Sequence, residues 1–168
     1  SVGKSAPGVK IKIKKFDKKL EIGEIIIHGK NVIKNYWKNP IADKNLENGW
    51  LQTNDIGYLD NDENLFLVGR NDDVINIGGE KVIPNEIEEI IKQIPEIEDV
   101  VAFGINNEIF GKTIKVNIIK KKNVKLDKIK ILSYCLKNLE KFKIPSKIEF
   151  VEIIPKNEYG KVKRSMLK

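Results

Sequence analysis

The sequence contains almost none of the side chains that build disulfides, zinc sites and histidine-dependent catalytic centres. Its 168 residues include one cysteine, Cys135, and one histidine, His28. A single cysteine excludes an internal disulfide and a cysteine-rich zinc site. A single histidine removes most Ser-His and Cys-His catalytic schemes, and His28 lies in an apolar run where a structural role is expected. We therefore predict no metal site in this chain.

The chain also lacks an apolar run of membrane-spanning length and a signal peptide. We therefore expect no transmembrane segment and a cytoplasmic location. The sequence begins with Ser1 rather than methionine, and its first residues resemble the middle of a domain. We expect it to be a fragment of a longer polypeptide.

The net charge of +7 raises an anionic partner as one possibility. The lysines are spread along the whole chain, however, and in residues 9–16 and 113–120 they alternate with apolar residues, as on solvated strand faces. No arginine-rich block with interleaved aromatic residues is present. We therefore expect no nucleic-acid partner, and a basic nucleic-acid-binding domain stays only as an alternative.

Hydrophobic periodicity divides the sequence into two parts. Strands are predicted at 8–16, 23–29 and twice within 50–70, with turns at 17–23 and 60–64. The later elements are a hairpin at 73–83, helices at 84–94 and 126–140, and strands at 99–105, 113–119 and 146–153. This pattern predicts an α+β fold: a mostly β subdomain, residues 1–70, and a small domain, residues 71–168, with a short antiparallel sheet and helices.

Both predicted helices carry an apolar stripe that indicates a core-facing side. The stripe of the first helix consists of Ile87, Ile90, Ile91 and Ile94. That of the second helix consists of Leu126, Ile129, Leu132, Leu136 and Leu139. Each set lies on one face of its helix, as in an amphipathic helix.

Three motifs carry the candidate chemistry: "TNDIGYLD" (53–60), "GRNDDVINIGGEKVIPNEIE" (69–88) and "PKNEYGKVKR" (155–164). Asp55 in the first could accept hydrogen bonds from two ribose hydroxyls. The only two arginines, Arg70 and Arg164, both lie within these motifs, which favours sites where the planar guanidinium matters. Each motif alone also fits an ordinary turn acid, a loop or a solvated charge run. Their order and spacing favour a functional site.

Together the motifs resemble the C-terminal end of the adenylate-forming superfamily, which comprises acyl- and aryl-CoA synthetases, adenylation domains of peptide synthetases, and luciferases. The resemblance covers nearly the whole chain. "SVGKSAPGVKIKI" and "GEIIIHGKNVIKNYW" are similar to the last β-subdomain of the family's large N-terminal domain. Residues 71–168 would then be its mobile C-terminal domain. "INIGGEKV" is closer to the form found in acyl-CoA synthetases.

The resemblance implies roles for individual residues in adenylate formation. Asp55 would bind the ribose hydroxyls of ATP, and Arg70 would contact ribose or phosphate. Lys161 in "YGKVKR" would be the adenylation lysine, presented by a short turn at Gly160. Asn54 departs from the family pattern, which has glycine before the aspartate.

The resemblance also implies roles in the second step, in which a thiol receives the activated acid. Asp72 would be the hinge about which the small domain rotates. Gly78 and Gly79 would line the pantetheine tunnel, since paired glycines allow close approach of a thin ligand. Lys81 would contact a CoA phosphate.

The implied reaction is ATP-dependent ligation of a small-molecule carboxylic acid to CoA, or to the phosphopantetheine of an acyl carrier protein, through an acyl-adenylate. Mg²⁺ would be bound mainly by an upstream N-terminal domain of the same polypeptide, which is the expected partner. Because the phosphate loop and the acid pocket are absent from this sequence, we expect the isolated chain to be inactive. A non-catalytic interaction or regulatory module with the same fold stays as the alternative.

Overall fold

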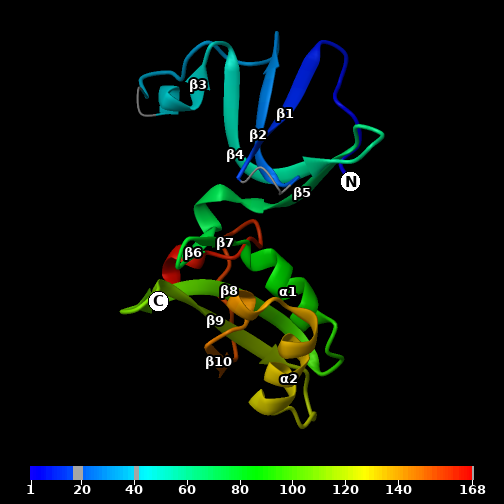
Figure 1. Ribbon diagram of the computed structural model, residues 1–168, viewed down its shortest axis with the longest axis vertical. Helices are drawn as coiled ribbons and strands as arrows, with labels where there is room; N and C mark the ends of the chain where they lie inside the picture. The colour runs from blue at the N-terminus through cyan, green and yellow to red at the C-terminus, as the bar shows by residue number, and fades with distance from the viewer. Residues whose placement is uncertain (17–20, 40–41, 168) are drawn as a thin grey trace. The chain divides into compact units, whose positions relative to one another are not determined.

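The structure, a computed structural model, describes residues 1–16, 21–39 and 42–167 (Figure 1). Part of the predicted turn at 17–23 therefore lies outside the described residues. The chain divides into two compact units, Ser1–Asp72 and Asp73–Lys168. The predicted α+β class is confirmed, with strands in both units and both α-helices in the second.

Unit 1 is an antiparallel sheet with the strand order β1-β2-β4-β3, and β5 pairs with β4. The strands are β1 (Val9–Lys15), β2 (Gly23–Gly29), β3 (Leu46–Glu47), β4 (Trp50–Leu59) and β5 (Leu65–Arg70). In β1 the lysines are exposed while Val9, Ile11 and Ile13 are half-buried. The alternation therefore places these lysines in solvent, as predicted for residues 9–16.

Unit 2 contains a three-stranded sheet with the order β10-β9-β8. β8 (Ile97–Asn107) and β9 (Gly111–Lys120) form an antiparallel hairpin, whereas β10 (Lys147–Phe150) runs parallel to β9. The predicted short antiparallel sheet is therefore confirmed for β8 and β9, whereas the direction of β10 differs from the prediction. A parallel neighbour needs a crossover connection, and the helix between β9 and β10 supplies it.

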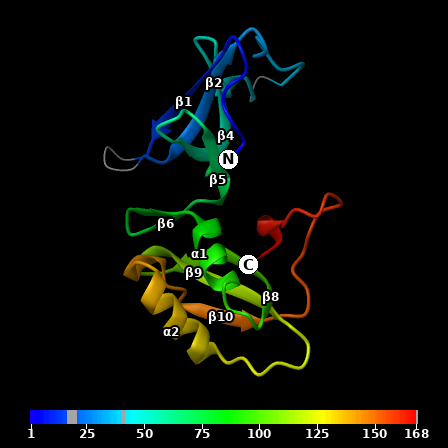
Figure 2. The ribbon, with the colours of Figure 1, turned by 90° about the vertical axis from the view of Figure 1, so that its right-hand side faces the viewer.

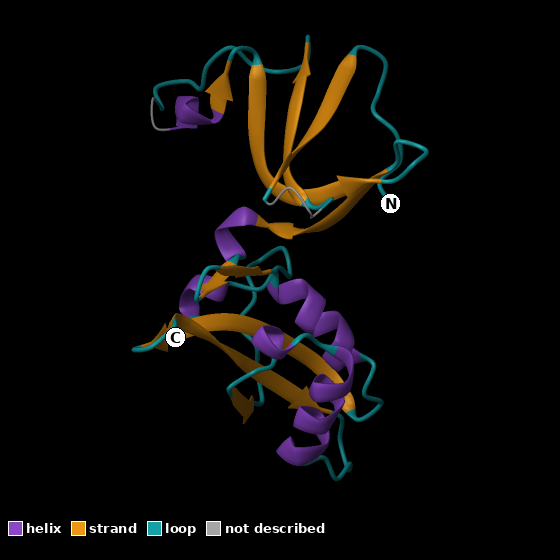
Figure 3. Ribbon diagram, viewed as in Figure 1, coloured by secondary structure: helices purple, strands orange, loops and turns teal. Residues whose placement is uncertain are grey.

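Unit 2 also contains the α-helices α1 and α2 (Figure 3). α1 (Pro84–Lys92) begins with proline in its first turn, where the missing N–H costs nothing, and carries Glu86 at the positive end of the helix dipole. α2 (Lys128–Asn138) is capped by Asp127, whose carboxylate accepts from the Lys130 N–H at 2.7 Å. A separate hairpin of β6 (Ile75–Ile77) and β7 (Glu80–Val82) precedes α1.

The predicted core face is confirmed for α1. Ile87, Ile91 and Ile94 are buried and Ile90 is half-buried. Ile87, Ile91 and Ile94 join a cluster with residues of β8 and β9, including Val100, Ala102, Ile114, Val116 and Ile118. One continuous hydrophobic core therefore holds the helix on the sheet.

The predicted core face of α2 was wrong. Ile131 and Cys135 are fully buried, whereas Ile129 and Leu136 are 75% and 60% exposed. Leu132 is exposed as well. Leu126 and Leu139, which flank the helix, do pack against the core. Two apolar stripes compete on this helix, and the stripe with fewer leucines faces the sheet.

The prediction that the lysines of residues 113–120 lie in solvent was also wrong at one position. Lys115 on β9 is buried, and its ammonium lies 2.8 Å from Glu149 Oε2 on the neighbouring β10. A buried ammonium is tolerated because the carboxylate compensates its charge.

No helix within residues 1–16, 21–39 and 42–167 is long and apolar enough to cross a membrane.

Candidate functional site

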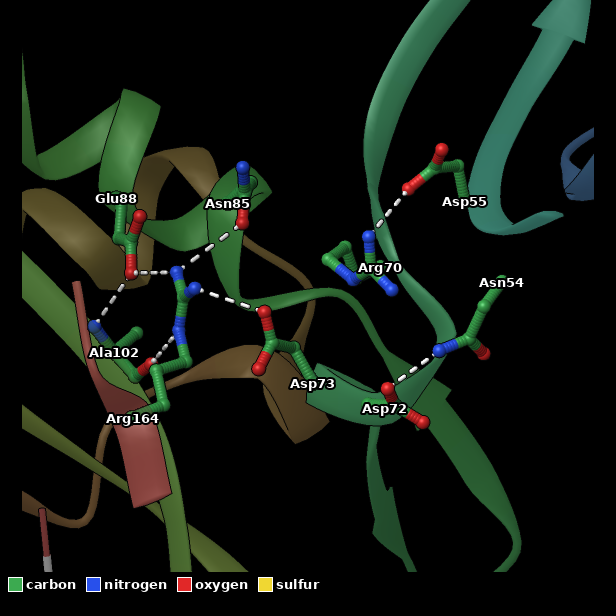
Figure 4. Close-up of polar contacts among 9 residues, drawn as sticks. All are labelled: Asn54, Asp55, Arg70, Asp72, Asp73, Asn85, Glu88, Ala102 and Arg164. Atoms are coloured by element: carbon green, nitrogen blue, oxygen red, sulfur yellow. Dashed lines mark hydrogen bonds and ion pairs between the residues drawn. The ribbon is translucent and has the colours of Figure 1, made fainter. Parts of the chain in front are cut away.

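Asp55 and Arg70 face each other on paired strands of unit 1. They are register partners on β4 and β5, and Arg70 Nη1 donates to Asp55 Oδ1 at 3.1 Å (Figure 4). The side chains are 39% and 54% exposed, so the pair adds little to stability and both groups remain accessible to a ligand. The ladder shifts register directly after Ile56, and such a bulge re-aims the neighbouring side chains.

Asn54 connects this pair to the predicted hinge residue. Its φ of 64° lies in the left-handed region, which glycine adopts freely and asparagine tolerates best among other residues. Asn54 therefore fits this backbone shape at the position where the resemblance described above led us to expect glycine. Its amide Nδ2 donates to Asp72 Oδ2, so the carboxylate of the last residue of unit 1 is held within unit 1 (Figure 4).

Arg164 is the centre of a polar cluster in unit 2 (Figure 4). Its guanidinium donates to Asp73 Oδ2 at 2.9 Å, Glu88 Oε1 at 2.7 Å and Asn85 Oδ1 at 3.2 Å. Its Nε donates to the carbonyl of Ala102 at 3.3 Å. Arg164 is 18% exposed and Glu88 12%, so water screens these contacts weakly. Sequence reasoning placed Arg164 in the third motif but assigned it no partner.

Lys161 lies in a tight turn that we call the Lys161 turn, residues 156–162. Asn157 closes it: its Oδ1 accepts from the N–H groups of Tyr159 and Lys161, at 3.0 and 2.8 Å. The Asn157 N–H donates in turn to the Lys161 carbonyl at 2.8 Å, and its carbonyl accepts from Gly160 at 2.9 Å. Gly160 has a φ of 75°, which needs glycine. The turn therefore fixes the main chain of Lys161 and leaves its side chain exposed.

The Lys161 turn, the red loop projecting from unit 2 in Figure 2, is held at its base by Lys156. Lys156 pairs with Val162 in an isolated bridge, and its ammonium lies 2.8 Å from Asp99 Oδ2. Burial alone would raise the pKa of Asp99, but hydrogen bonds from Lys156 and the Val100 N–H, with the nearby lysine charges, bring that pKa below its ordinary value. Asp99 therefore stays ionised as an anchor.

The glycine turn between β6 and β7 is also built as the sequence predicted. Gly78 and Gly79 have φ values of 58° and 98°. The Gly79 N–H donates to Asn76 Oδ1 at 3.0 Å, and the Gly78 N–H donates to the Phe110 carbonyl at 3.2 Å. A β-carbon on Gly79 would meet nothing within 4 Å, so glycine is needed for the backbone conformation rather than for space. Lys81 is exposed on the second strand of this hairpin.

The structure therefore groups the predicted site residues in two sets. Asp55, Arg70 and Asp72 belong to unit 1, where the contact between Asn54 and Asp72 was not predicted from the sequence. Gly78, Gly79, Lys81 and Lys161 belong to unit 2. Asn157 was missed there, although an asparagine shortly before a turn glycine is a known turn signal. In the part of the chain that the structure describes, no three His, Cys, Asp or Glu residues lie close enough to hold a metal ion.

Comparison with known proteins identifies the class that this fold and these sites define. Residues 86–161 match the model of the AMP-binding enzyme C-terminal domain. Over 86% of the chain it is 39% identical to oxalate–CoA ligase of Arabidopsis thaliana, covering 28% of that protein. Over 88% of the chain it is 37% identical to 2-succinylbenzoate–CoA ligase of Geobacillus kaustophilus, covering 30%.

Solved structures agree with this result. ATP-bound MatB from Rhodopseudomonas palustris superposes with a TM-score of 0.90 at 30% identity, covering 98% of this chain and 34% of that one. The o-succinylbenzoate CoA synthetase of Bacillus subtilis, in complex with its acyl-adenylate, gives 0.86 at 32% identity, covering 96% and 34%. The chain belongs to the adenylate-forming enzymes and corresponds to their C-terminal portion. It spans about a third of the length of these relatives.

Proposed function

We propose that this chain is the C-terminal third of an ATP-dependent carboxylic acid–CoA ligase that works through an acyl-adenylate. The observation that carries the proposal is the Lys161 turn, which fixes the main chain of one lysine through Asn157 and leaves its ammonium exposed. Two relatives of this chain are CoA ligases, which supports CoA as the thiol acceptor. The phosphopantetheine of a carrier protein presents the same thiol.

In the first half-reaction, the substrate carboxylate attacks the α-phosphate of ATP, and pyrophosphate leaves. Both reactants are anions, so a fixed positive charge between them stabilises the transition state. Lys161 supplies this charge. Because the turn is already closed, little ordering of the main chain is needed at the moment of reaction.

Asp55 and Arg70 hold the nucleotide in this scheme. A carboxylate can accept two hydroxyl hydrogen bonds, as the ribose diol requires. The exposed Arg70 guanidinium keeps Asp55 oriented and has further N–H donors for ribose or phosphate oxygens. Mg²⁺ enters with ATP as part of the substrate, and the described residues offer no carboxylate cluster to hold it.

In the second half-reaction, the thiol attacks the acyl carbon and AMP leaves. Lys161 has to withdraw, and the glycine turn at Gly78–Gly79 takes its place beside the thiol. Rotation about Asp72 performs both changes at once, as a conformational gate. The two units divide after Asp72, which supports a hinge at this position.

The test compares Lys161→Ala with Lys163→Ala in a full-length ligase that contains this chain. Adenylation is measured by ATP–pyrophosphate exchange, and thioester formation from a supplied acyl-adenylate. We expect Lys161→Ala to slow adenylation by about 10²–10³-fold, as for removal of one preorganised donor, with little effect on thioester formation. Lys163 is the matched control because it is also exposed and lies two residues away.

Equal effects of the two variants would show that the third motif is only a charged tail. A second measurement uses the isolated chain, which we expect to give no exchange with any acid, since it lacks a phosphate loop. Robust exchange by the 168-residue chain would overturn the proposal that it is one part of a larger ligase.

A further inference from the structure

Two consecutive aspartates have partners in different units. Asp72, the last residue of unit 1, accepts from Asn54 of the same unit, whereas Asp73, the first residue of unit 2, accepts from Arg164 of unit 2 (Figure 4). One peptide bond joins Asp72 and Asp73. The carboxylate of Asp72 therefore holds the main chain to unit 1 directly before this bond, and the carboxylate of Asp73 holds it to unit 2 directly after it.

Arg164 connects four separate segments of unit 2. Its contacts reach the start of the unit at Asp73, the first two turns of α1 at Asn85 and Glu88, and the main chain of β8 at Ala102. Glu88 Oε1 in turn accepts from the Ala102 N–H at 2.8 Å, which closes the cluster. A guanidinium with three of its nitrogens engaged is held in one orientation.

The same arginine lies three residues after Lys161, and the chain between them is hydrogen-bonded. The Lys163 N–H donates to the Pro155 carbonyl at 3.0 Å, and Val162 bridges to Lys156. The Lys161 turn is therefore joined without a loose segment to the Arg164 cluster, and through it to Asp73.

We propose that Arg164 is a positioning residue, which ties the Lys161 turn to Asp73 so that a change of direction at residues 72–73 moves Lys161 as part of one rigid body. The inference rests on the proposed function for the importance of Lys161, but the mechanical link can be measured without it. A purely structural arginine would instead stabilise unit 2 as a whole and have no special effect on the turn.

The first experiment measures backbone ¹⁵N relaxation in the 168-residue chain and its variant Arg164→Gln, with Lys163→Gln as the matched control. In the parent chain we expect the Lys161 and Gly160 amides to have rigid-backbone order parameters of about 0.85. In Arg164→Gln they should fall toward about 0.6, while the centres of β8 and β9 stay unchanged. Lys163→Gln should resemble the parent.

Unchanged order parameters in the Lys161 turn, or an equal loss throughout unit 2, would overturn the proposal. Should Arg164→Gln fail to fold, Arg164→Lys provides the second variant. The lysine keeps a positive charge near Glu88 and Asp73 but lacks the planar guanidinium with its several N–H donors. The Lys161 turn should therefore loosen while the fold is retained.

The second experiment measures both half-reactions in the full-length ligase, well below its unfolding temperature. Arg164→Gln and Asp73→Asn should each slow adenylation, on the order of 10- to 100-fold for a misplaced group, and spare thioester formation. Because both remove the same link, the double variant should be little worse than either single one. Additive losses, or equal losses in both half-reactions, would refute the link. If Lys161→Ala leaves adenylation unchanged, the proposed function is refuted instead, and the relaxation data still decide the link.

Discussion

Replacement of Ile131 by alanine tests which side of α2 forms the core. Ile131 is fully buried and belongs to the hydrophobic cluster of unit 2. The substitution removes three carbons, worth about 0.8 kcal/mol each in transfer free energy. With the cavity left behind, we expect unit 2 to lose about 3 kcal/mol of unfolding free energy. Ile129 on the same helix is 75% exposed, so Ile129→Ala should change the unfolding free energy of unit 2 by less than about 0.5 kcal/mol.

The assay exploits the distribution of the chromophores. Both tryptophans, Trp37 and Trp50, lie in unit 1, whereas both α-helices lie in unit 2. Urea unfolding followed by helical circular dichroism therefore reports mainly on unit 2, and tryptophan emission reports on unit 1. Ile131→Ala should shift the first transition and leave the second in place.

The result that would refute this reasoning is a larger loss for Ile129→Ala than for Ile131→Ala. It would mean that the leucine-rich stripe predicted from the sequence faces the core after all. A shift of the tryptophan transition by Ile131→Ala would show that the two units unfold together.

Three further predictions concern other parts of the chain. Burial raises the pKa of the Cys135 thiol to about 11, so iodoacetamide at pH 8 should modify it only after denaturation, and rapid reaction of the native chain would contradict its burial. Hydrogen bonds from Lys115 and Lys147 lower the pKa of Glu149 from 4.5 to about 2, so the stability it contributes is present above pH 4.5 and lost as the pH falls through 2. The unfolding midpoints of the parent and Glu149→Gln should accordingly converge towards pH 2, and a constant difference from pH 7 to 2 would speak against the ion pair. Asp72→Pro fixes one backbone φ, so in the full-length ligase one half-reaction should survive far better than the other, and equal loss of both would argue against a hinge.

Local sequence signals were sufficient for the type of α1, α2 and every strand except the two-residue β3, and for the glycine turns. α1 was predictable because Pro84 marks its start and one unambiguous stripe of isoleucines marks its buried face. The turn at Gly78–Gly79 was predictable because two successive glycines between strand-like runs mark a hairpin turn, and both adopt positive φ values in the structure. The order of the three motifs identified the family before any contact was known.

Where two sequence patterns look equally strong, the sequence alone did not predict which side chains are buried. α2 has two apolar stripes, and the choice between Ile129 and Ile131 depends on the sheet that it covers. Lys115 follows the same alternation as the exposed lysines of β1, and it is buried only because β10 places Glu149 beside it. The parallel direction of β10 follows from the crossover through α2.

The sequence by itself determined the α+β class, the family and the candidate residues Asp55, Arg70 and Lys161, because each of these is written in short contiguous patterns. Only the tertiary structure decided what surrounds them. Arg164 finds Asp73, which lies 91 positions earlier, and a contact over that distance leaves no periodicity or turn signal in the chain. Such contacts exist only in the folded unit, where burial of shared apolar side chains packs α1 against β8 and so places Glu88, Asn85 and Ala102 together as partners for Arg164.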